Sequence, residues 1–316
     1  MRNLCYTYTR IRFVASFFLL GAAALLFPGC ASKPEYTIKP KVSVQDASLE
    51  TDPAGKITNL SYDQLIAKAD LYLRNDNSRL AELHYRKALD IEPESTEALI
   101  GLSNLFVREG QLEKASKHLE IALDNNPANA QALLLMGIVS RNRGDLERSL
   151  EWLGNASEQL PANTQILTEM AITNDHMGQE RLTYAEHLYK RVISLKPNSS
   201  AAHNNLGFNY LLQGRNNDAV KSFSKALALN PDNQRAKNNL GAAYLLIRQP
   251  AKALKLFQDT VGLAAAYNNL GYIEMVRGNR NEAERAFKKA LQLNPSFYVR
   301  AQQNLERLEH LATRVR

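Results

Sequence analysis

Apolar residues recur at spacings of three and four through residues 201–233, and this period predicts two amphipathic helices joined by a short polar turn. The apolar positions are Leu206, Gly207 and Tyr210 in the first helix and Ala219, Phe223 and Ala226 in the second. Gly207 and Ala219 have almost no side chain, so the two helices are expected to approach closely there. Pro231 lacks the amide proton that a continuing helix needs, and Gly214 suits the turn. Such a hairpin buries only one side of each helix and needs neighbours of its own kind.

The hairpin pattern repeats along most of the chain with a period of about 34 residues. Prolines mark the ends of six copies, at Pro93, Pro127, Pro161, Pro197, Pro231 and Pro295. The copies span 62–95, 96–129, 130–163, 164–199, 200–233, 234–263 and 264–297. The copy at 164–199 is longer than the others, which predicts a longer turn between its helices. The copy at 234–263 is shorter, which predicts a shortened second helix.

This period, with its small and aromatic residues at fixed positions, resembles the tetratricopeptide repeat family. The resemblance implies an all-α solenoid of about seven helix hairpins over residues 60–297. A further amphipathic helix is predicted from Tyr298 to Ala312, with Val299, Leu305, Leu308 and Leu311 on its apolar side. Residues 298–316 are therefore expected to form a capping helix and tail that shield the last repeat from water.

Residues 1–29 predict a signal peptide that is removed from the mature protein. Three arginines precede an apolar run over 13–27, which is shorter than the roughly 20 residues of a membrane-spanning helix. The run ends in LFPGC at 26–30, which resembles a bacterial lipobox, although Phe27 and Pro28 depart from the usual aliphatic and small residues. The alternative is an uncleaved N-terminal anchor with an incidental cysteine.

The lipobox resemblance implies that Cys30 is acylated and becomes the mature N-terminus. Ala31 follows it, in place of the aspartate that the resemblance associates with the inner membrane. The predicted location is therefore the periplasmic face of the outer membrane of a Gram-negative bacterium. Cys5 leaves with the signal peptide, so no thiol remains for a disulfide. Residues 30–59 are polar and predict a flexible tether, with a short partner-binding strand at 36–44 as the alternative.

Composition and charge argue against catalysis and nucleic-acid binding. The formal net charge is +7, and loss of the three arginines of the signal peptide leaves a mild +4 on the mature chain. The six histidines are scattered without metal-ligand spacing, and no phosphate-binding glycine loop or nucleophile elbow occurs in the sequence. We therefore predict a non-enzyme with no cofactor, metal or small-molecule substrate. The single tryptophan, Trp152, is expected to pack in the core or between repeats, with a ligand platform as the alternative.

The candidate binding residues are a tetrapeptide, Asn-Asn-Leu-Gly, that recurs in the first helix of three repeats. Its asparagines are Asn204, Asn205, Asn238, Asn239, Asn268 and Asn269. Amides can both donate to and accept from the backbone of an extended peptide, and we expect at least one of each pair to face a binding groove. Phe208 and Tyr272 lie nearby and could pack apolar side chains of such a ligand. Asparagine is also common at this position of the family, so a generic repeat residue is the alternative.

The C-terminal run from Ala265 to Leu305, together with the lipobox, the tether and the short repeat, resembles the TadD family. These are the repeat lipoproteins of the tight-adherence (Flp pilus) secretion system. The resemblance implies a scaffold that binds protein partners and helps to place or assemble the outer-membrane secretin. The alternative is a type IV pilotin, or an adaptor lipoprotein that docks peptidoglycan hydrolases.

Overall fold

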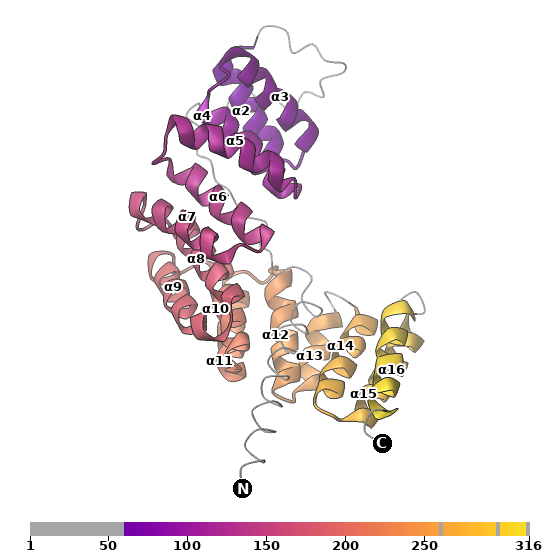
Figure 1. Cartoon of the computed structure of the whole chain (residues 1–316). Helices are drawn as coiled ribbons and strands as arrows, with labels where there is room; N and C mark the ends of the chain where they lie inside the picture. The colour runs from indigo at the N-terminus through magenta and orange to yellow at the C-terminus, as the bar shows by residue number, and fades with distance from the viewer. Residues whose placement is uncertain (1–59, 259–261, 295–297, 314–316) are drawn as a thin grey trace. The chain divides into compact units, whose positions relative to one another are not determined.

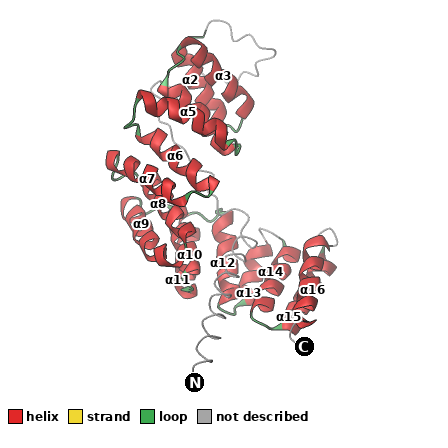
Figure 2. Ribbon diagram, in the orientation of Figure 1, coloured by secondary structure: helices red, strands yellow, loops and turns green. Residues whose placement is uncertain are grey.

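The computed structural model describes residues 60–258, 262–294 and 298–313. In these ranges the chain forms 15 α-helices and one 3-10 helix, without strands (Figures 1 and 2). The all-α repeat fold expected from the sequence is confirmed. The predicted signal peptide and tether, with Cys30, lie outside the described residues.

The chain divides between Met177 and Gly178 into two compact units. The first unit contains α2 (Tyr62–Arg74), α3 (Ser78–Ile91), α4 (Thr96–Arg108), α5 (Leu112–Asn125), α6 (Ala130–Arg143), α7 (Leu146–Gln159) and α8 (Thr164–Met177). The second contains η2 (Gln179–Arg181), α9 (Leu182–Leu195), α10 (Ser200–Leu212), α11 (Asn216–Leu229), α12 (Gln234–Leu246), α13 (Pro250–Gln258), α14 (Leu263–Val276), α15 (Arg280–Leu293) and α16 (Tyr298–Thr313).

Within each unit, consecutive helices pack in pairs, and the first helix of a pair also packs on the first helix of the next (Figure 1). The first helix of each repeat begins at the first residue of the predicted repeat, except that α14 begins one residue early, at Leu263. The long turn expected in the fourth repeat is present and contains η2. The short second helix expected in the sixth repeat is α13, which has nine residues. The helix predicted after the last repeat is α16.

Polar residues fix where the first helices begin. Ser61 and Gln64 form a capping box at the start of α2, each side chain bonding the backbone N–H of the other. Ser95, Ser199 and Asn233 accept the N–H of the residue three positions later at the starts of α4, α10 and α12. These caps satisfy amide protons that have no partner within the helix.

Glycine allows the two helices of a repeat to touch. A Cβ on Gly207 would lie 2.7 Å from ring atoms of Phe223, and a Cβ on Gly241 would lie 2.8 Å from the ring of Phe257. Both rings are completely or almost completely buried. The absent side chain is therefore what lets each aromatic ring pack closely against the facing helix.

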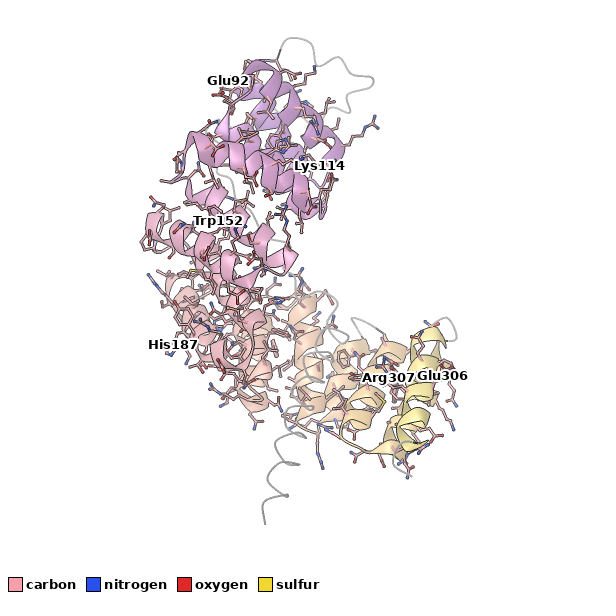
Figure 3. All side chains as sticks on the ribbon, viewed as in Figure 1. Glu92, Lys114, Trp152, His187, Glu306 and Arg307 are labelled. Atoms are coloured by element: carbon pink, nitrogen blue, oxygen red, sulfur yellow. The ribbon has the colours of Figure 1, made fainter. Side chains whose placement is uncertain are left out.

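The first unit has one continuous apolar core that runs from α2 to α8. Its largest fully buried side chains include Tyr85 and Phe106. Trp152 lies on α7 (Figure 3) and packs partly buried against this core, as expected. In the second unit, separate clusters form around Phe257 and Phe287. Among the helices that the structure describes, none is both long enough and apolar enough to cross a membrane.

Arginine side chains join one repeat to the next. The guanidinium of Arg108 donates to the carbonyl oxygen of Leu73 at 2.8 Å. Likewise, Arg277 donates to the carbonyl oxygens of Leu245 and Leu246 at 2.9 and 2.7 Å. These carbonyls lie in the last turns of α2 and α12, beyond the reach of the regular helical hydrogen bonds, and Leu245 also accepts the backbone N–H of Arg248 at 3.1 Å. The first helices of adjacent repeats are thus held at fixed spacing.

Candidate functional site

The six predicted asparagines lie on α10, α12 and α14, three first helices that pack on one another in sequence. We call them the amide row: Asn204, Asn205, Asn238, Asn239, Asn268 and Asn269. Each pair contains one buried and one half-buried side chain. The buried amides are Asn204, Asn239 and Asn268, and the half-buried amides are Asn205, Asn238 and Asn269.

The buried amides are hydrogen-bonded between helices. Asn239 donates from Nδ2 to Oδ1 of Asn204 at 2.9 Å, which joins α12 to α10. Asn304 donates from Nδ2 to Oδ1 of Asn268, also at 2.9 Å, which joins α16 to α14. Buried amides need such partners, because an unpaired polar group costs free energy when it is removed from water. This half of the row connects the repeats.

The half-buried amides have hydrogen-bonding capacity left over. Oδ1 of Asn238 is a buried oxygen without a hydrogen-bond donor. The side chain of Asn269 has no hydrogen bond within the described part of the chain, and Asn205 receives one long bond of 3.4 Å from Asn204. Asn205 and Asn269 can therefore accept from and donate to a ligand backbone without breaking the contacts between helices, whereas the unsatisfied Oδ1 of Asn238 is itself buried.

The two aromatic residues of the predicted site differ in exposure. Phe208 is half-buried on α10. Tyr272 is 6% exposed and belongs to a core cluster with Phe287 and Leu308. Burial raises the pKa of Tyr272, and the nearby charge of Arg307 (Figure 3) opposes this effect. Tyr272 therefore packs chiefly against α15 and α16, and little of its ring is available to a ligand.

In the same unit, the carboxylate of Glu186 on α9 joins α9 to the C-terminal end of α10. It accepts from Lys190 at 2.7 Å, Arg215 at 2.9 Å, Gln213 at 3.0 Å and the hydroxyl of Tyr210 at 3.2 Å. Burial alone would raise the pKa of Glu186, but the hydrogen bonds and positive charges outweigh it and lower the pKa to about 2. This carboxylate is ionised at neutral pH, and its accepting oxygens are fully engaged in holding the helices.

In the first unit, the position of the second asparagine holds Ala67, Gly101, Leu135 and Glu169. Glu169 is 3% exposed and forms an ion pair with Arg141 between α6 and α8. These residues are apolar or already paired, so the asparagine pairs that the sequence singled out occur only in the second unit, and the peptide-binding site there stays a prediction.

No group of three or more histidine, cysteine or carboxylate side chains with metal-binding geometry occurs in the described ranges. The lipidation site predicted at Cys30 cannot be placed, because it precedes the first described residue. Asn304 was missed by the sequence reasoning. Its distance from Asn268 is close to one repeat, which is the sequence feature that could have identified it.

Sequence-family models described as Tetratricopeptide repeat match residues 72–138, 200–233 and 264–297. No curated protein sequence matches the chain. Among solved structures, a tetratricopeptide repeat protein from Parabacteroides merdae has a TM-score of 0.57 and 18% identity, covering 78% of this chain and 98% of that one. The pilF protein of Pseudomonas aeruginosa has a TM-score of 0.51 and 19% identity, with coverages of 77% and 95%. The Cut9–Hcn1 assembly of the APC/C has a TM-score of 0.62 and 14% identity, with coverages of 82% and 50%. At these identities the structural matches show the fold alone.

Proposed function

We propose that this chain, which is a tetratricopeptide repeat protein, uses its amide row to hold an extended segment of a protein partner. Proteins of this fold are scaffolds for protein–protein interaction and are typically not catalytic. The observation that carries the proposal is that every asparagine pair contains one buried and one half-buried side chain. The buried member pairs within the protein, while the half-buried member keeps amide groups for a ligand.

An extended peptide presents one N–H and one C=O per residue, and amide side chains can match both. The unsatisfied Oδ1 of Asn238 is buried, so a backbone N–H of a ligand reaches it only when this side chain turns outward. Phe208 lies on the same helix as Asn205 and offers apolar surface beside it. Hydrogen bonds to the ligand backbone give affinity. Contact with Phe208 adds a preference for ligands that carry an apolar side chain there.

The proposed biological setting rests on the sequence. A lipobox-like segment ending at Cys30, a polar tether and a repeat array resemble the tight-adherence repeat lipoproteins. We therefore propose an outer-membrane lipoprotein, anchored through Cys30 at the periplasmic face, that assists assembly or placement of the Flp pilus secretion machinery. Its proposed partner is the secretin or another component of that machinery.

The test is an in-cell cross-link and pull-down with the full chain. The groove variant carries Asn205→Ala, Asn238→Ala and Asn269→Ala, which leave the buried hydrogen bonds in place. We expect wild type to capture a secretin or another pilus-assembly component and the groove variant to lose it. Arg148→Asn, an exposed change on α7 in the other unit, is the matched control and is expected to capture the partner normally.

Cys30→Ser tests the anchor separately. We expect this variant to leave the outer-membrane fraction while the folded repeats persist. Capture of peptidoglycan hydrolases in place of pilus components would support the adaptor function. Capture that is unchanged in the groove variant would refute the role of the amide row.

A further inference from the structure

A surface cavity of about 500 Å³ lies at the turn end of the sixth and seventh repeats. Its apolar lining includes Leu245, Pro250 and Leu270, and its charged lining consists of Arg248, Glu274, Glu282 and Arg285. None of the amide-row residues lines it. The cavity is therefore a separate feature of the second unit, formed by α12, α13, α14 and α15.

The cavity coincides with a missing aromatic ring. At the position equivalent to Glu274, four other repeats hold Tyr72, Phe106, Tyr210 and Tyr244. In three of them a cation covers the ring, as Arg215 covers Tyr210 at 4.3 Å, Lys252 covers Tyr244 at 5.3 Å and Lys114 (Figure 3) covers Phe106 at 5.4 Å. The third and fourth repeats hold Ser140 and Asn174 at this position, and the seventh holds Glu274, whose side chain lines the cavity.

Both carboxylates of the cavity are already paired. Glu274 accepts from Arg277 at 2.7 Å and from the amide of Asn279 at 2.5 Å. Glu282 accepts from Arg285 at 2.6 Å. Neither carboxylate therefore needs a cation from outside.

Arg248 differs from the other charged groups of the lining. Arg248 is exposed, and within the described ranges its side chain makes no hydrogen bond or ion pair, so among these residues it is the lining charge without a counter-charge.

The backbone of Arg248 is also unusual. Its φ is +60°, in the left-handed region that side-chain-bearing residues rarely adopt. The same turn position holds glycine or aspartate in the other repeats: Asp76, Gly110, Gly144, Gly178, Gly214 and Gly278. Non-glycine residues held in this region cluster at functional sites, where the surrounding structure enforces them. Glycine would adopt this turn conformation with less strain. Arginine instead places a cation at the cavity.

We propose that this cavity is a second protein-binding site that takes an acidic segment of a partner. A carboxylate of that segment pairs with Arg248, and an adjacent aliphatic or aromatic side chain packs on Leu245 and Leu270. Charge complementarity favours this occupant. Glu274 is paired with Arg277 from outside the lining and Glu282 with Arg285, so Arg248 is the cation that remains, and the other walls are largely apolar. The site does not depend on the amide row, and the two can bind different segments.

The test selects nine-residue peptides from a random phage-displayed library against the full chain purified in detergent. We expect peptides with aspartate or glutamate beside a leucine, isoleucine or phenylalanine. Binding of a selected peptide is then measured by fluorescence polarisation, together with its analogue in which the acid is replaced by the amide. We expect at least tenfold weaker binding of the analogue to wild type.

The decisive variant is Arg248→Asn, because asparagine tolerates the left-handed backbone while the guanidinium is removed. We expect at least a tenfold loss of peptide affinity with an unfolding temperature equal to or above that of wild type. Arg148→Asn, which removes an arginine elsewhere, is expected to bind as wild type does. Selection without an acidic motif, or binding unaffected by Arg248→Asn, would overturn the proposal. Binding lost in the amide-row variant instead would assign the peptide to the amide row and overturn it too.

Discussion

Asn239 donates a hydrogen bond from its side-chain amide to Oδ1 of Asn204, and this 2.9 Å contact joins the first helices of two adjacent repeats. Both side chains are buried, at 5% and 8% exposure. Asn239, which the sequence predicted as a candidate groove residue, thus stabilises the stacking of the repeats. Within one Asn-Asn pair, the buried residue joins the helices, and the half-buried residue is the one that we propose for ligand binding.

The first prediction compares Asn239→Ala with Asn269→Ala. Asn239→Ala removes the donor and leaves Oδ1 of Asn204 buried without it, so we expect the free energy of unfolding to fall by about 1–3 kcal/mol. Asn269 has no such bond within the described residues, and its replacement is expected to change stability by less than about 0.5 kcal/mol. Thermal unfolding followed by circular dichroism measures both. Equal losses in the two variants would show that the interhelical bond contributes nothing.

The helix boundaries could be predicted from the sequence because proline, glycine and capping residues act locally. Ser61 and Gln64, for example, determine the start of α2 through contacts within four residues. The division of the amide row could not be predicted, because the period places Asn238 and Asn239 on one helix without specifying which of them meets the next repeat. The pairing of Asn268 with Asn304 and the cavity at Arg248 depend likewise on how neighbouring repeats pack.

The second prediction concerns the contact of Gly207 with Phe223. A Cβ at position 207 would lie 2.7 Å from a fully buried ring, so Gly207→Ala is expected to destabilise the chain by about 1–3 kcal/mol. Gly154 on α7 has no heavy atom within 4 Å of an added Cβ, and its φ is not positive. Gly154→Ala should therefore stabilise by up to about 1 kcal/mol through helix propensity. The unfolding temperatures of the two variants should move in opposite directions, and a shared direction would contradict the packing argument.

The third prediction concerns the ion pair of Arg141 and Glu169, whose side chains are 13% and 4% exposed. Glu169→Leu alone leaves a guanidinium with its counter-charge removed, and we expect a loss of about 3–5 kcal/mol. The double variant Arg141→Leu/Glu169→Leu removes both charges and is expected to recover most of that loss. Urea unfolding followed by the fluorescence of Trp152, which lies in the same unit, reports the result. A double variant as unstable as the single one would show that packing, and not charge, accounts for the loss.

The fourth prediction is a pH dependence centred on Glu186. Its pKa falls from 4.5 to about 2 in the folded protein, so folding favours the ionised form. The resulting stabilisation is complete above pH 4.5 and is lost as the pH falls through about 2. With its side chain 9% exposed, we expect this group to contribute on the order of 3 kcal/mol at neutral pH.

Glu186→Gln isolates this contribution from the other carboxylates that titrate in acid. The difference in unfolding free energy between wild type and variant should be constant above pH 5 and should shrink steadily between pH 4.5 and 2. Urea unfolding followed by circular dichroism across this range measures the difference. Glu284→Gln is the control, because that exposed carboxylate pairs with Lys288 at the surface and should change stability little at any pH. A wild-type-minus-variant difference that stays flat down to pH 2 would mean that the cations around Glu186 do not hold its charge.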